Sequence, residues 1–154
     1  MKINSFLCFA LYSTSRSMNQ LYGTYLDKYD LTYPQLLVLF LLWEKEGQSL
    51  KELGAQLFLD NGTLTPLLKR MEKKNLLNRK RSTEDERVVQ VFLTPHANEL
   101  RGMIPQMADS MLCDIGMKPE EIKKMAKNIN KIRNNIEAAI VAKEKALPLA
   151  STTI

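Results

Sequence analysis

Two cysteines, Cys8 and Cys113, are the side chains of this sequence that are suited to redox reactions. They lie far apart in the chain, so they lack the spacing of a zinc finger or a disulfide-rich scaffold. The single histidine, His96, follows Pro95, where we expect a surface or helix-capping residue. The sequence therefore offers no metal ligand set, we expect no cofactor, and any chemical role of the thiols is redox chemistry.

A second group of functional candidates is a run of basic side chains. The segment KRMEKKNLLNRKR, from Lys69 to Arg81, carries seven basic residues against one acid, Glu72, in a chain of net charge +5 and pI near 9.2. A basic run on its own has two interpretations, a solvated helix face or a surface for polyanions. The elements that carry the run decide between them.

The amino-terminal half of the chain has the pattern of helices. An apolar stripe from Phe6 to Tyr29 predicts a long first helix. Thr32 with Gln35, and Ser49 with Glu52, have the form of capping boxes and predict helices over LLVLFLLW, ending near Gly47, and over SLKELGAQLF. A turn is expected at DNGT.

The basic run itself spans a helix and a hairpin. Helical periodicity in TLTPLLKRMEKKNLL is complicated by Pro66, because propensity places Thr65 at the cap and an earlier start at Asp60 leaves a proline inside the helix. Two strands, Asn78 to Arg81 and Arg87 to Leu93, follow with a polar tip between them.

The carboxyl-terminal half is again helical. One helix ends around Gly116 and is bent by Pro105, and another opens at Lys118. Its apolar residues alternate three and four positions apart, a seam that requires a partner helix. They are Ile122, Met125, Ile129, Ile132, Ile136 and Ala139.

This order of elements predicts a mostly α (α+β) fold, a winged helix-turn-helix with long terminal dimerisation helices. We expect one domain over residues 1–145, with a DNA-binding lobe at about 48–94, dimerisation helices at about 5–30 and 95–145, and a disordered tail at 146–154. The wing makes the basic run a phosphate-facing surface, and a homodimer would place two such lobes on an inverted repeat of double-stranded DNA. Without a signal peptide or a transmembrane segment, the chain is expected to be cytoplasmic, with no membrane partner.

The run LDNGTLTPLLKRMEKKNLLNRKRSTEDERVVQVFLT resembles the DNA-binding lobe of the MarR family of bacterial transcription regulators. LCFALYSTSRSMNQLY followed by LTYPQLLVLFLLWE is similar to the branch of that family that senses organic hydroperoxides. The resemblance covers roughly residues 6 to 140 and implies that the recognition helix begins near Asp60 despite Pro66. One departure is Asn61, where many members of the branch have Ser.

For DNA, the resemblance implies that the first turn of this helix faces the groove, with Asp60 at its start and Asn61, Thr63, Leu64 and Thr65 as the facing residues. It also implies that Arg87 enters the minor groove and that Asp85 holds this arginine or buttresses the hairpin turn. Phosphate contacts require cations, and the candidates are Lys69, Arg70, Lys73, Arg79, Lys80 and Arg81.

For the thiols, the resemblance implies that Cys8 senses peroxide, although a lone cysteine among apolar neighbours is by itself more typical of a small buried hydrophobe. Tyr22 and Tyr33 fall where the branch places tyrosines that bond to the thiolate. Tyr22 follows Cys8 by 14 positions, roughly 21 Å on a continuous helix, so it would serve the partner's thiol. Cys113 would form an intersubunit disulfide with Cys8; in the alternative one-cysteine mode, a small thiol caps Cys8.

The expected function is therefore a repressor released from DNA by organic hydroperoxides. Two alternatives are a MarR-type regulator controlled by a small aromatic ligand and a thiol peroxidase that uses Cys8. The basic hairpin, and the absence of a turnover constellation of His, Asp or Arg around Cys8 in the sequence, argue against an enzyme.

Overall fold

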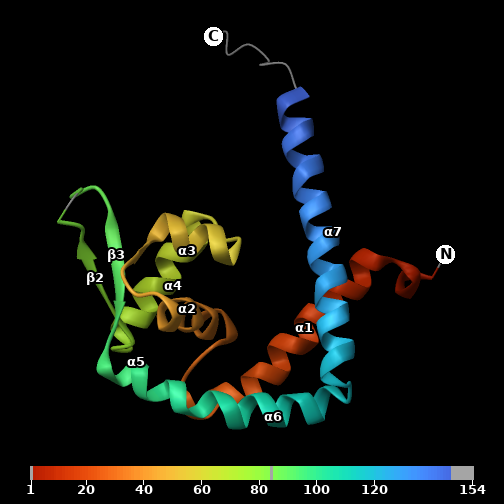
Figure 1. Ribbon diagram of the computed structural model, residues 1–154, viewed down its shortest axis with the longest axis horizontal. Helices are drawn as coiled ribbons and strands as arrows, with labels where there is room; N and C mark the ends of the chain where they lie inside the picture. Colours follow the sequence, from red (N-terminus) through yellow and green to blue (C-terminus); the bar gives the residue numbers. More distant parts are fainter. Residues whose placement is uncertain (1, 84, 147–154) are drawn as a thin grey trace. The chain divides into compact units, whose positions relative to one another are not determined.

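The computed structural model describes residues 2–83 and 85–146, and Figure 1 shows the order of their helices and strands. The chain divides into two compact units, residues 1–107 and 108–154. The first unit holds the described elements up to the start of helix α6, and the second holds the rest of α6 and helix α7.

The first unit begins with a short 3₁₀ turn, Ile3–Ser5, and helix α1, Leu7–Leu26. A 3₁₀ turn, Asp27–Tyr29, ends the predicted first helix, and Asp30 follows in the left-handed region (φ 52°). Helix α2, Tyr33–Glu44, has its capping box: the Thr32 backbone N–H donates to Gln35 Oε1 at 3.0 Å. Both the first helix and this cap are thus confirmed.

Helix α3, Leu50–Leu57, and helix α4, Asn61–Lys73, form the helix-turn-helix. The predicted capping box of α3 is confirmed, since the backbone N–H of Glu52 donates to Ser49 Oγ at 3.2 Å and that of Ser49 to Glu52 Oε2 at 2.7 Å. The turn between the helices requires glycine at position 54, because a Cβ there would lie 2.8 Å from the carbonyl oxygen of Leu59.

Helix α4 begins where the resemblance places it. Asp60 is its N-cap and Pro66 lies inside it, so the expectation of a turn over DNGT was wrong for Asn61 to Thr63. The apolar stripe of α4 explains why the helix continues through a proline. Leu64, Leu67, Leu68 and Met71 are all buried, and burying such side chains contributes more than the bond lost at Pro66.

Three short strands form an antiparallel sheet in the order β1-β3-β2. Strand β2, Leu77–Arg81, pairs with β3, Val89–Leu93, from Leu77 opposite Leu93 to Arg81 opposite Val89, which confirms the hairpin. In Figure 1 these two strands run side by side next to α3 and α4, so the unit is a winged helix. The two-residue strand β1, Gln48–Ser49, pairs with β3 and was not predicted.

After β3 the chain forms helix α5, Pro95–Glu99, a 3₁₀ turn, Leu100–Met103, and helix α6, Ile104–Ile115. The predicted distortion at Pro105 takes the form of this 3₁₀ turn: the N–H of Ile104 bonds to the carbonyl of Arg101, the oxygen that Pro105 has no N–H to reach.

Helix α7, Pro119–Ala146, makes up most of the described second unit. Several apolar residues of its predicted seam are exposed: Met125 at 49%, Ile129 at 40% and Ile136 at 53%. The tail predicted to be disordered lies, from residue 147 on, outside the described residues.

Candidate nucleic-acid interface and redox site

The first turn of α4 is organised by Asp60. Its Oδ1 accepts the backbone N–H of Thr63 at 2.9 Å, and the Thr63 hydroxyl donates to Oδ2 at 3.1 Å. These hydrogen bonds, the backbone one first, hold the pKa of Asp60 below its ordinary value. The carboxylate therefore fixes the start of the helix, so its place in a DNA interface is that of a cap.

The exposed surface of this turn is smaller than the sequence suggested. Asn61 and Thr63 are exposed and Thr65 is half-buried, but Leu64 is 0% exposed. Leu64 shares the buried stripe of α4 and packs toward Gly54 of α3. The expectation that Leu64 faces the groove is at odds with this burial, and we assign Leu64 to the core.

Most of the predicted phosphate contacts are available at the surface. Lys69, Arg70, Lys73, Lys80 and Arg81 are exposed. Arg79 differs, because its Nε donates to Glu72 Oε2 at 3.0 Å and its backbone N–H to Oε1 at 3.3 Å. The hydrogen bond from the Arg79 side chain is the main cause that lowers the pKa of Glu72. Arg79 thus joins the end of α4 to β2.

A second basic residue, Lys74, also forms an ion pair within the protein. Lys74 Nζ lies 2.8 Å from Asp30 Oδ1 and donates to the Asp30 carbonyl at 2.6 Å. This pair ties the end of α4 to the left-handed residue before α2. This pair was not predicted from the sequence, because Asp30 and Lys74 are distant in the chain.

The tip of the hairpin carries Asp85 and Arg87, both exposed. Asp85 Oδ1 accepts the backbone N–H of Arg87 at 3.0 Å, and the Asp85 carbonyl accepts the N–H of Val88 at 2.9 Å. Asp85 therefore orders the backbone that carries Arg87, which agrees with its expected role of buttressing the hairpin turn.

A cleft of about 400 Å³ brings several of these residues together. It lies between the start of α3, the first turns of α4 and the start of β3. Its lining is Ser49, Leu50, Lys51, Asn61, Thr65, Arg87, Val88 and Val89. Lys51 was missed by the sequence analysis, although its place just after the Ser49 cap puts it at the exposed start of the first helix of the helix-turn-helix.

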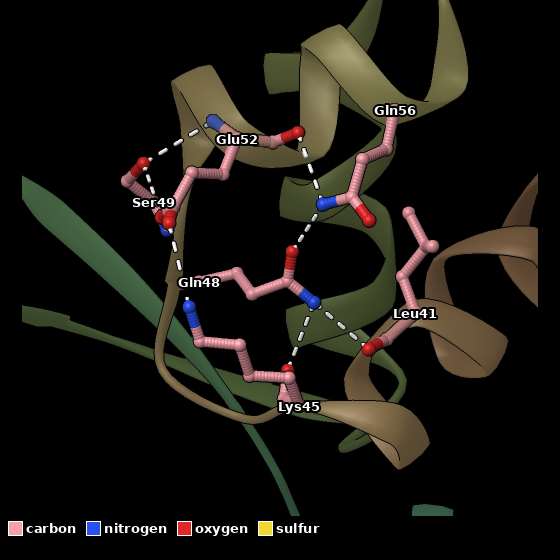
Figure 2. Close-up of polar contacts among 6 residues, drawn as sticks. All are labelled: Leu41, Lys45, Gln48, Ser49, Glu52 and Gln56. Atoms are coloured by element: carbon pink, nitrogen blue, oxygen red, sulfur yellow. Dashed lines mark hydrogen bonds and ion pairs between the residues drawn. The ribbon is translucent and has the colours of Figure 1, made fainter.

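Helix α3 is held at this cleft by the buried side chain of Gln48. Figure 2 shows its amide nitrogen donating to the carbonyls of Leu41, at 2.8 Å, and Lys45, at 2.9 Å. Its amide oxygen accepts a hydrogen bond from Gln56 of α3. Gln48 is 3% exposed and thereby links the end of α2, strand β1 and α3.

Both cysteines are free thiols and both are exposed. Cys8 is the second residue of α1, whose first turn holds no acidic side chain, so the positive end of the helix dipole acts on it without competition from that turn. Its exposure in this chain contradicts the simpler interpretation of a small buried hydrophobe. Cys113 lies in the last turn of α6, off the buried face of Met107 and Met111.

Tyr22 of α1 and Tyr33 of α2 stack against each other, with ring centroids 4.0 Å apart and an interplanar angle of 25°. Burial, the charge of an ionised Tyr33 and a hydrogen bond with Tyr33 raise the pKa of Tyr22 to about 12. The Tyr22 hydroxyl thus stays protonated to a higher pH than an ordinary tyrosine.

Within residues 2–83 and 85–146, no cluster of three or more His, Cys, Asp or Glu side chains is arranged to hold a metal ion. His96 Nδ1 lies 3.8 Å from Glu99 Oε2 at the surface. None of the helices among these residues has the length and apolarity needed to cross a membrane.

Sequence comparisons connect this arrangement with known proteins. Residues 20–104 match the family described as "Transcriptional regulator SarA/Rot". The chain is 40% identical over 151 residues to the HTH-type transcriptional regulator TtmR of Methylorubrum extorquens (strain PA1), covering 98% of this chain and 76% of that protein. It is 56% identical over 94 residues to the organic hydroperoxide resistance transcriptional regulator of Bacillus subtilis (strain 168), covering 61% and 64%.

Solved structures give the same picture. The structure of reduced AbfR bound to DNA matches with a TM-score of 0.76 at 30% identity, covering 87% of this chain and 93% of that one. AbfR, from Staphylococcus epidermidis, has also been solved in a disulfide form, which matches with a TM-score of 0.62 at 31% identity, covering 82% and 88%.

Proposed function

Because the chain belongs to the SarA/Rot family of transcriptional regulators, a MarR-like family, we propose that it is a cytoplasmic, homodimeric repressor that leaves its operator when an organic hydroperoxide oxidises Cys8. Membership of this family confirms the MarR resemblance. The observation that carries the redox part is the free, exposed thiol of Cys8 in the first turn of α1.

DNA binding has support from the geometry of the first unit. Asn61 and Thr63 present short polar side chains at the exposed start of α4, the end of a recognition helix that contacts base edges. Lys69, Arg70, Lys73, Lys80 and Arg81 supply exposed cations for phosphates, and Arg87 at the wing tip suits a narrow minor groove. AbfR, similar over most of this chain, has been solved bound to DNA.

The sensing step is a two-electron oxidation of sulfur. The Cys8 thiolate attacks the terminal oxygen of the hydroperoxide, a sulfur–oxygen bond forms, and the oxygen–oxygen bond breaks. The leaving alkoxide takes a proton and becomes an alcohol, while Cys8 becomes a sulfenic acid. The chain is in this way a stoichiometric sensor and not an enzyme with turnover.

Tyr22 and Tyr33 can take part in this step only if they contact the Cys8 thiolate of the partner subunit. Helix α1 is continuous from Leu7 to Leu26, so Cys8 and Tyr22 of one chain are roughly 21 Å apart along its axis. We propose that Tyr22 and Tyr33 of one subunit donate hydrogen bonds to the Cys8 thiolate of the other. The stacking of the two rings and the hydrogen bond between them support this, because they hold the two hydroxyl groups together.

Cys113 supplies the second step. Its thiol, exposed near the end of α6, attacks the sulfenic sulfur of the partner's Cys8, forming a disulfide and releasing water. A disulfide form is known for the similar protein AbfR. In the alternative one-cysteine mode, a small thiol takes the place of Cys113.

A gel shift tests the repressor mechanism. The wild-type protein should bind an inverted-repeat duplex, lose it after treatment with cumene hydroperoxide, and regain it after dithiothreitol. Cys8→Ser should bind the same duplex and stay bound in peroxide. Release of Cys8→Ser by peroxide would refute Cys8 as the sensor, and absence of any binding to duplex DNA would refute the repressor.

Non-reducing electrophoresis tests the pairing of the cysteines. After cumene hydroperoxide, the wild-type protein should run as a covalent dimer, and Cys113→Ser should run as a monomer. A Cys113→Ser protein that forms the covalent dimer equally well excludes the Cys8–Cys113 bond.

A second candidate function is release by a small aromatic ligand, and one cavity favours it. The cavity measures about 290 Å³ and is lined by Phe40, Trp43, Glu44, Arg101, Ile104 and Pro105. The rings of Phe40 and Trp43 meet edge to face, with centroids 5.7 Å apart, and Arg101 suits a carboxylate. Release of Cys8→Ser from the duplex by sodium benzoate, without peroxide, would identify this mode.

A further inference from the structure

The cleft beside α4 has walls from three elements that the chain brings together. One wall is the start of α3, with Leu50 and Lys51, and the second is the first turns of α4, with Asn61 and Thr65. The third is the end of the wing tip, with Arg87, and the start of β3 at Val89. The recognition helix and the wing therefore both line a hollow of about 400 Å³.

The geometry of duplex DNA gives this hollow an occupant. A recognition helix lies in the major groove and a wing reaches the adjacent minor groove. One sugar-phosphate strand separates any two adjacent grooves. A protein that places α4 in one groove and Arg87 in the next must therefore leave room for that strand between them.

The lining suits such a strand. Cations stand on two of its walls, Lys51 and Arg87, and none of its lining residues is acidic. Leu50, Val88 and Val89 offer apolar surface for deoxyribose. Lys51 is exposed, and its ammonium group forms no hydrogen bond or ion pair with the part of the chain that the structure describes.

A nearby carboxylate, Glu52, is turned to other partners. It accepts the Ser49 backbone N–H at 2.7 Å and the Ser49 hydroxyl at 2.8 Å, and it lies 3.6 Å from Lys45 Nζ. Figure 2 shows these contacts beside the hydrogen bonds that Gln56 donates to the Glu52 carbonyl and to Gln48. Helix α3 thus presents Lys51 next to a residue, Glu52, whose carboxylate is already engaged.

We propose that this cleft seats the DNA strand between the major and minor grooves, and that Lys51 contacts a phosphate of that strand. The inference rests on the proposed DNA-binding function and adds a third contacting element, the first helix of the helix-turn-helix, to the recognition helix and the wing. A phosphate contact carries no base preference, so Lys51 contributes affinity and register.

Salt dependence tests Lys51 against a matched control. In Lys51→Gln, the slope of log K against log salt concentration should become shallower by about 0.9 per subunit, or about 1.8 for a dimer. The same loss should appear on an operator selected by the wild-type protein and on a random duplex. Lys124→Gln removes the same charge from an exposed position of α7, outside the cleft lining, and should keep the wild-type slope.

Replacing single phosphates by uncharged methylphosphonates shows which phosphate Lys51 contacts. Methylphosphonate substitutions, placed one at a time in the strand between the grooves, should weaken binding of the wild-type protein at one position per half-site. At that position, the substitution should cost Lys51→Gln no further affinity. Wild-type slopes in Lys51→Gln, or equal methylphosphonate losses in both proteins, overturn the inference. Failure of the wild-type protein to bind any duplex refutes the proposed function itself.

Discussion

At the scale of single residues, two arginines of one strand illustrate how the fold assigns different roles to similar side chains. Arg79 is half-buried and paired with Glu72, whereas Arg81 is exposed. An arginine already bonded to a carboxylate has fewer donors for phosphate, so we expect Arg79 to stabilise the fold and Arg81 to bind DNA. The basic run is therefore part structure and part interface.

Glu72→Gln tests the structural half of this division. The folded state lowers the pKa of Glu72 below its ordinary value of 4.5. The stabilisation is thus present above pH 4.5 and is lost as the pH falls through the lowered pKa. At neutral pH, Glu72→Gln should lower the free energy of unfolding by about 1 kcal/mol, and the difference from wild type should shrink in acid. Urea unfolding at several pH values measures this difference.

Arg81→Gln serves as the control. It should leave the free energy of unfolding unchanged while making the salt slope of DNA binding shallower.

Tyr33→Phe tests the electrostatics of the tyrosine pair. Burial is the largest cause of the raised pKa of Tyr22, and both other causes come from the Tyr33 hydroxyl. Removing that hydroxyl should therefore bring the pKa of Tyr22 down from about 12 while leaving it above 10.0. NMR titration of ring-labelled tyrosine measures the change. A pKa that stays at about 12 would show that burial alone accounts for the shift.

At the scale of elements, the Gln48 carboxamide joins three of them, and Gln48→Met isolates its contribution. Methionine keeps the volume and the burial but leaves the Lys45 carbonyl without the side-chain donor and Gln56 without its acceptor. We expect a loss of about 1 to 3 kcal/mol in the free energy of unfolding. Gln20→Met, at an exposed position of α1, should cost clearly less. Equal losses in thermal or urea unfolding would contradict a special role for Gln48.

The elements also show what the sequence could and could not predict. The caps at Thr32 and Ser49 were predictable because their partners, Gln35 and Glu52, lie three positions away in the chain. Strand β1 was not, because a two-residue strand exists only through its pairing with β3, which is distant in sequence. The start of α4 was ambiguous from propensity alone, since tertiary burial of its leucines outweighs the proline.

The candidate site was predictable to a similar degree. Residue type and resemblance indicated the surface of α4, the wing and Cys8. Leu64 was misplaced because its position in the helix was taken from the motif and not from the apolar stripe that it shares with Leu67 and Leu68. Lys51 was overlooked because a single lysine on a helix carries no pattern, and only the cleft places it beside Asn61 and Arg87.

At the scale of the whole molecule, the proposed mechanism requires two subunits, and α7 offers a surface for joining them. Its exposed apolar residues, Met125, Ile129, Ile136, Ile140 and Val141, leave a large hydrophobic stripe on a helix of 28 residues. Such a stripe favours association with another helix. We expect a dimer at micromolar concentration in analytical ultracentrifugation.

Ile129→Glu with Ile136→Glu should dissociate this dimer, because each carboxylate would have to be buried in an apolar seam. Asn130→Glu adds the same side chain on the polar face of α7, beside Lys127 and Asn134, and should leave the dimer intact. Circular dichroism should show equal helix content in all variants, and gel shifts should show DNA binding lost only in the double variant, since a monomer holds one half-site at a time. Full DNA affinity in a dissociated double variant would separate DNA binding from dimerisation. In such a monomer, Tyr22 and Tyr33 would have no Cys8 of a partner subunit to contact. They would have to contact Cys8 of their own chain, which the length of α1 between Cys8 and Tyr22 prevents.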